Sequence, residues 1–171
     1  NQAHVSRITE DALFGADDGE LFLEYTQSEG ITFDDGRVKS ASFDTTQGFG
    51  LRAVSGEATG YAHSSELSEV AIRRAADTMK AVRTGHAATL AQGPSGTNRT
   101  LYTDINPLGE MAFADKVQLL TDVDTYARGS DTRVKQVSAS LTGEWQAVQI
   151  LRGDGQRAAD IRPLVGMRVN V

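Results

Sequence analysis

QGFGLRAVSGEATGYAHSSELSEVAIRRAADTMKAV, residues 47–82, predicts a strand, a tight turn, a second strand and a capped helix. In the first strand Phe49, Leu51 and Ala53 alternate with other residues, which is the period of two of a pleated strand. Gly56 provides the turn, because glycine adopts positive φ without steric cost. The second strand presents one face, formed by Thr59, Tyr61 and His63. The stretch therefore predicts a hairpin that leads into a helix.

The helix at the end of this stretch has three candidate N-caps, namely Ser64, Ser65 and Ser68. Its apolar residues recur at spacings of three and four, which indicates one buried helix face. These residues are Leu67, Val70, Ala71, Ala75, Met79 and Val82. The hairpin and helix together predict a complete folding unit in which the helix packs on the sheet.

Elsewhere the sequence predicts a short helix over 4–14 and strands over 20–26, 31–33 and 37–44. Asp34-Asp35-Gly36 lies between two of these runs and is a strong hairpin signal. With the opening stretch, the first 82 residues give roughly five strands and a long helix.

The second half predicts one more helix, with an apolar stripe and Gly129 as its C-cap. The stripe consists of Phe113, Val117, Leu120, Val123 and Ala127. Three strands are expected after it, over 137–141, 146–152 and 165–171. Pro163 lacks an amide donor, so the last strand starts late, bulges there or lies at a sheet edge. The predicted fold class is α+β, with mostly antiparallel sheets and two long helices packed on them.

The domain organisation predicted from these patterns has three parts. Residues 1–82 form a hairpin-rich α+β half, and 100–171 form a helix plus antiparallel strands of the same domain. Between them, 83–99 is rich in glycine and has little periodicity, which predicts a linker or mobile loop. The last strand still alternates at Val171, so we expect the chain to be truncated at its C-terminal end.

Composition excludes several classes of function. The chain has 171 residues, a net charge of -6 and no cysteine, so disulfides and thiolate sites are absent. Residues 1–36 hold nine carboxylates and one base, Arg7, which argues against nucleic acid as a partner. This acidic part is either a solvated face or a docking surface for a basic partner. No apolar run approaches the ~20 residues of a membrane helix, and the absence of cysteine fits the predicted cytoplasmic location.

Searches for catalytic motifs give no site residue. Gly48-Phe49-Gly50-Leu51-Arg52-Ala53 matches the loose dinucleotide fingerprint, but it lies inside a strand pattern and no helix follows it directly. The three histidines, His4, His63 and His86, have no zinc-type helical spacing. We therefore predict no catalytic, cofactor-binding or metal-binding residue in this chain, and none of its residues is expected to bind zinc tightly.

Several motifs together resemble the N-terminal domain of the TldD/PmbA family, whose members also carry the name modulator of DNA gyrase. The resemblance rests on the following segments: Asp34-Asp35-Gly36-Arg37-Val38-Lys39, the glycine-rich run from Gln47 to Ser68, Asn106-Pro107-Leu108, Lys116 to Leu120, Asp154-Gly155 and Arg162-Pro163-Leu164-Val165. It covers nearly the whole chain except the N-terminal arm and 83–98. The Leu-Arg-Ala-Val run followed by Gly-Tyr-Ala is more similar to the TldD branch.

The resemblance implies that the parent protein is a zinc metalloprotease that degrades or trims unfolded peptides. Its H-E-x-x-x-H helix and its zinc would belong to a C-terminal half that this chain lacks, so the chain alone is predicted inactive. The implied role is a scaffold that binds a TldE/PmbA-like partner subunit and offers a strand edge to an extended peptide. Separately, the apolar face expected for the last strand predicts self-association of the chain. The alternative is a non-enzymatic interaction module of the gyrase-modulator type.

Overall fold

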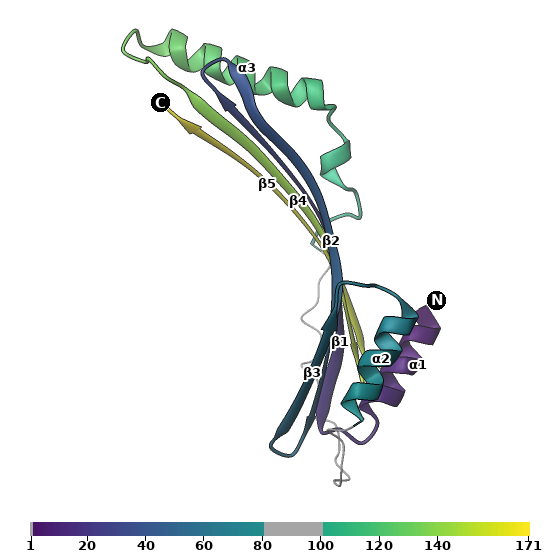
Figure 1. Ribbon diagram of the computed structural model, residues 1–171. Helices are drawn as coiled ribbons and strands as arrows, with labels where there is room; N and C mark the ends of the chain where they lie inside the picture. The colour runs from purple at the N-terminus through teal and green to yellow at the C-terminus, as the bar shows by residue number, and fades with distance from the viewer. Residues whose placement is uncertain (1, 81–100) are drawn as a thin grey trace. The chain divides into compact units, whose positions relative to one another are not determined.

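The computed structural model describes residues 2–80 and 101–171. Its elements follow one another as α1 (Gln2–Leu13), β1 (Asp18–Asp34), β2 (Arg37–Ser55), β3 (Ala58–Ser64), α2 (Glu69–Met79), the short 3-10 helix η1 (Pro107–Gly109), α3 (Phe113–Ser130), β4 (Ser138–Arg152) and β5 (Arg157–Asn170). The five strands form one antiparallel sheet in the order β3-β2-β1-β4-β5 (Figure 1). The predicted α+β class is therefore confirmed, and the described residues contain the short N-terminal helix and the two further α-helices that the sequence predicts.

The chain divides into two compact units, each built from three stretches of sequence. Unit 1 comprises the described residues of 1–25, 46–101 and 147–160, and unit 2 comprises 26–45, 102–146 and 161–171. Strands β1, β2, β4 and β5 contribute residues to both units. The predicted linker 83–99 lies outside the described residues, and the division of the chain at that segment stays a prediction.

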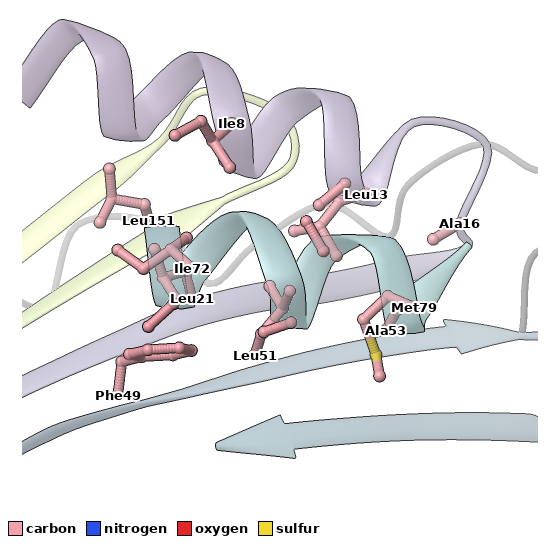
Figure 2. Packing of buried hydrophobic residues seen from close by; sticks show 14 residues of the cluster. Ile8, Leu13, Ala16, Leu21, Phe49, Leu51, Ala53, Ile72, Met79 and Leu151 are labelled. Atoms are coloured by element: carbon pink, nitrogen blue, oxygen red, sulfur yellow. The ribbon is translucent and has the colours of Figure 1, made fainter. Parts of the chain in front are cut away.

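The core of unit 1 lies between its part of the sheet and the helices α1 and α2, which contact each other (Figures 1 and 2). Leu21, Leu51 and Leu13 are fully buried there, and Phe49 and Ile72 are nearly so. Complete burial of a large aliphatic side chain contributes about 1.5–3 kcal/mol, so this cluster is the main source of stability in unit 1.

Unit 2 has a smaller core, in which α3 packs on the sheet. Ile31 and Phe33 of β1 meet Leu120 of α3 and Ala139 of β4. The buried face of α3 matches the prediction only in part, because Leu120 is buried and Val123 packs against the core. Phe113 is 53% exposed, whereas Lys116 and Asp124 are buried on either side of Leu120. The predicted C-cap Gly129 lies inside α3, which ends at Ser130.

Local turn and cap chemistry is confirmed. The turn at Asp35-Gly36 has positive φ at both residues, 50° and 79°, as a two-residue hairpin of this type requires. Gly56 also has positive φ in the turn between β2 and β3. Of the three candidate caps, Ser68 is the one used, because its hydroxyl accepts a hydrogen bond from the Ala71 amide.

The strand boundaries correct the sequence analysis. The separate strands expected on either side of Gly30 are one strand, β1, and those on either side of Gly48 are one strand, β2. Residues 2–80 therefore hold three strands rather than five, and residues 101–171 hold two rather than three. Glycine costs only about 0.5–1 kcal/mol inside a strand, and pairing with neighbouring strands outweighs that cost. Pro163 lies in β5, which is an edge strand, so the third alternative for that proline is confirmed.

The buried face of α2 also differs from the prediction. The helix begins at Glu69, so Leu67 precedes it, and Val70 in the first turn is 64% exposed. The buried residues are Ala71, Ile72, Ala75, Ala76 and Met79. The prediction is therefore confirmed for Ala71, Ala75 and Met79, and Val82 lies outside the described residues. No helix within residues 2–80 and 101–171 is long and apolar enough to cross a membrane.

Candidate functional site

A largely apolar groove in unit 2 is the strongest candidate for a docking site. This α3 groove has a volume of about 550 Å³ and lies between the η1–α3 segment and the strands β4 and β5. Its apolar lining consists of Leu108, Met111, Leu119, Leu141, Val165 and Met167. Exposed apolar surface of this kind is typical of sites that bind a protein segment.

A buried ion pair holds one wall of the α3 groove in place. The Lys116 ammonium donates to a Glu29 carboxylate oxygen and to the Leu108 carbonyl oxygen, both at 2.7 Å. The two charged side chains are only 9% and 14% exposed. The pair therefore ties three elements, α3, β1 and η1, to one another.

The Asn106-Pro107-Leu108 motif forms the same wall. The Asn106 side chain caps η1 by accepting from the Leu108 amide at 3.0 Å, and it donates to Gln27 of β1. Leu108 packs directly on Gly143 of β4, where a Cβ would overlap its side chain. This motif therefore positions Leu108 in the α3 groove, which the sequence alone did not show.

The glycine-rich motif lines a second hollow, in unit 1, which we call the glycine cleft. It has a volume of about 370 Å³ and is bounded by Phe22 and Glu24 of β1, residues 46–50 of β2, and Tyr61, Ser64 and Ser65. A Cβ on Gly48 would lie 2.9 Å from the Ser64 carbonyl oxygen, and one on Gly50 would lie 2.6 Å from the Tyr61 hydroxyl. The close approach of the β3 backbone therefore requires a glycine at position 48, whereas at position 50 the exposed Tyr61 side chain would have to move. Both contacts agree with packing rather than with phosphate binding.

A cross-strand ion network stabilises the strands of unit 1. Arg52 of β2 donates to both Glu20 and Asp18 of β1, with distances of 2.7–2.8 Å. Arg152 of β4 donates to the other oxygen of Asp18 at 2.9 Å. Burial raises the pKa of Asp18, but the Arg52 hydrogen bond and the charges of both arginines outweigh it and hold that pKa below its ordinary value of 3.8. The Asp18 carboxylate of β1 therefore accepts hydrogen bonds from both neighbouring strands, β2 and β4.

We expect Asp18→Asn to lower the free energy of unfolding at pH 7 by about 1 kcal/mol, with a loss that shrinks in acid. A carboxyl group whose pKa is lower in the folded state contributes stability above its unfolded pKa. That contribution disappears as pH falls through the folded value, below 3.8. Urea titrations at pH 7, 4 and 3 measure the change. Asp44→Asn, at an exposed position, is the matched control, and an Asp18→Asn loss that does not depend on pH would contradict the assignment.

The described residues do not fit a zinc site. Within residues 2–80 and 101–171, no group of three or more His, Cys, Asp or Glu side chains could hold a metal ion. His4 is bonded to Glu69 and Arg73, and His63 stacks on Tyr61 with ring centroids 5.7 Å apart. We derive no hydrolytic step from these residues, and the absence of a metal site in the whole chain stays a prediction.

No site residue is predicted from the sequence, and the features that only the structure reveals are charged. The Lys116–Glu29 pair and the Arg52 network join residues far apart in the chain. A lysine on the apolar stripe of a helix is a signal that could have revealed the first pair. Nothing in the local sequence pattern of β1 or β2 reveals the Arg52 network.

Comparison with known proteins identifies two family domains in order along the chain. Residues 19–83 match the PmbA/TldA metallopeptidase domain 1, and 106–171 match the PmbA/TldA metallopeptidase central domain. The chain is 37% identical over 159 residues to a metalloprotease TldD homolog of Haemophilus influenzae, covering 91% of this chain and 33% of that protein. A TldD homolog of Buchnera aphidicola is 33% identical over 156 residues, with 91% and 32% covered. The chain spans about a third of the length of these curated relatives.

Solved structures share the fold at low sequence identity. A Bacteroides thetaiotaomicron protein named for modulation of DNA gyrase has a TM-score of 0.75 and 14% identity, covering 99% of this chain and 40% of that one. TldE from Thermococcus kodakarensis has a TM-score of 0.61 and 13% identity, with 99% and 42% covered. The order of the two matched domains, the TldD homologues and the common fold agree with the motifs of the sequence, and the chain belongs to the TldD/PmbA family.

Proposed function

We propose that this chain is the scaffold and partner-binding part of a TldD-like zinc metalloprotease subunit that degrades or trims unfolded peptides. The observation that carries the proposal is the match to domain 1 and the central domain in a chain that spans a third of its TldD relatives. In this proposal the H-E-x-x-x-H helix and its zinc, which would activate water for peptide hydrolysis, lie in the remaining part of the protein.

The role proposed for these residues is to bind and to position, in the cytoplasm. The α3 groove supports it, because an apolar hollow bounded by the edge strand β5 suits a partner subunit or an extended peptide. A TldE/PmbA-like subunit is the partner that we propose. The likeness to the TldE fold is consistent with a pair of subunits built on one architecture.

Reading the gene downstream of the Val171 codon tests the proposal most directly. We expect an open reading frame that continues and encodes H-E-x-x-x-H. A gene that stops near Val171, or that continues without this motif, would favour the non-enzymatic interaction module instead. A zinc-dependent peptidase assay of the full-length product is the second measurement.

The isolated chain is expected to self-associate through the apolar residues of β5, and Met167→Lys or Val169→Lys should shift it toward monomer. Val165, Met167 and Val169 are all exposed, and Met167 is 45% exposed at the rim of the α3 groove. A lysine there replaces favourable apolar burial with a charge that must be desolvated in the contact.

Light scattering at matched concentration measures the shift, with Tyr126→Lys as the control at an exposed aromatic residue of α3. A parent chain that is already monomeric at high concentration, with 165–171 protected from hydrogen exchange, would show that β5 is not the contact.

A further inference from the structure

A third hollow, at the end of unit 1, has features that neither the core nor the proposed function uses. This α1 hollow has a volume of about 500 Å³ and lies between the C-terminal end of α1 and the turn that joins β4 to β5. Phe14 borders it and is 81% exposed, although it directly follows the buried Leu13. The Phe14 side chain lies outside the core, so its ring is exposed to solvent beside the hollow.

Two carboxylates border the same hollow. The Glu10 Oε1 atom lies 3.8 Å from the position that a Cβ on Gly155 would take, so the Glu10 side chain reaches the β4–β5 turn. Glu10 is exposed to solvent, near the C-terminal end of α1. The Asp154 side chain, in that turn, accepts a hydrogen bond from the Gln156 amide. Its second carboxylate oxygen lies 3.7 Å from the Arg152 Nε atom.

The end of α1 adds to the negative potential of the hollow. The carbonyl end of a helix carries a partial negative charge, which a basic side chain in the last turn normally offsets. The last turn of α1 contains no basic residue. Of the nearby arginines, Arg152 donates to Asp18 and also pairs with Asp154, so it offsets the charge of that carboxylate but not that of Glu10, and Arg157 donates to the Ser6 hydroxyl.

We propose that the α1 hollow receives an arginine side chain from a segment of a partner protein. The guanidinium would lie over the Phe14 ring, close to the Glu10 carboxylate and the end of α1, so that three features attract the same cation. A planar guanidinium satisfies the ring and the carboxylate together, which a lysine ammonium does less well. The acidic border disfavours nucleic acid, and the charges disfavour a purely apolar occupant.

Titration with N-acetyl-arginine amide tests the proposal on the 171-residue chain, followed through the backbone amides by NMR. The matched probe is N-acetyl-citrulline amide, which has nearly the same shape without the charge. We expect the amide chemical shifts of Gly15 and of Gly153 to Gly155 to change with the arginine probe and not with the citrulline probe. Binding of the arginine probe should weaken as the salt concentration is raised.

Variants separate the two contributions to binding. Glu10→Gln removes only the charge, and Phe14→Leu removes the ring but keeps an apolar side chain. Each should weaken binding of the arginine probe by roughly three- to fivefold. Glu57→Gln is the control, because Glu57 is an exposed carboxylate in the β2–β3 turn. Thermal unfolding of each variant checks that the fold is unchanged.

The proposal is overturned if citrulline and arginine probes bind alike, if the shifts map away from the α1 hollow, or if Glu10→Gln behaves like Glu57→Gln. None of these results bears on the metalloprotease proposal, whose test is the downstream gene and the peptidase assay.

Discussion

Lys116→Met is expected to lower the free energy of unfolding by about 3–5 kcal/mol, because it leaves the Glu29 carboxylate buried without its partner. Glu29 is only 14% exposed, and Lys116 also satisfies the Leu108 carbonyl oxygen. Methionine fills most of the same volume, so the loss comes from the uncompensated charge and the broken hydrogen bonds rather than from a cavity.

Urea denaturation at pH 7 measures this loss, and a second substitution identifies its cause. The double variant Lys116→Met/Glu29→Leu should recover most of the stability, since replacing both members of a buried ion pair by apolar residues is often neutral. Lys39→Met is the control, because Lys39 lies in an exposed pair with Asp34 at 3.6 Å and should cost less than about 1 kcal/mol. A double variant no more stable than Lys116→Met would show that the charge is not the cause.

The second large effect is expected from a single methyl group at Gly19. A Cβ at this buried position of β1 would lie 2.5 Å from the Leu13 Cδ2 atom and 2.6 Å from the Arg52 carbonyl oxygen. The Leu13 side chain is fully buried, and the Arg52 carbonyl belongs to a paired strand, so neither can move without cost. We expect Gly19→Ala to lower the free energy of unfolding by about 2–3 kcal/mol.

Gly129→Ala is the matched control and should change stability in the opposite direction. Gly129 lies within α3, and a Cβ there would meet no heavy atom within 4 Å. Alanine should therefore stabilise the chain by about 0.5–1 kcal/mol through its helix propensity. Thermal unfolding distinguishes the two signs. A neutral Gly19→Ala would mean that β1 and β2 are not as closely paired at this point as the structure shows.

Four positions show why glycine carries different information at different places in the chain. Gly56 and Gly36 were predicted in turns, and both have positive φ. Gly129 was expected at a helix end for the same reason, yet α3 continues through it and ends at Ser130. Gly48 lies inside a long strand, where the approach of Ser64 requires a residue without a side chain. Local sequence cannot distinguish these cases, since the deciding contact comes from another strand.

The α3 groove was not predicted for a related reason. Its wall depends on Lys116 pairing with Glu29, two residues 87 positions apart. The sequence pattern of α3 showed an apolar stripe, but the face that is buried includes Lys116 and Asp124. A buried lysine becomes acceptable only where a carboxylate and a carbonyl oxygen are already in place, and only the folded chain provides them.

The sequence by itself determined the hairpin turns, a serine cap for α2, the α+β class and the family, because each depends on residues close in the chain or on a motif that can be compared directly. The structure selected Ser68 from the three candidate serines. The tertiary structure alone decided where β1 and β2 run without interruption and which helix faces are buried. It also decided how three separate stretches of sequence build each unit. The physical reason is that strand pairing, ion pairing and close packing depend on residues that are far apart in the sequence and meet only when the chain folds. A local sequence pattern does not contain both residues of such a pair.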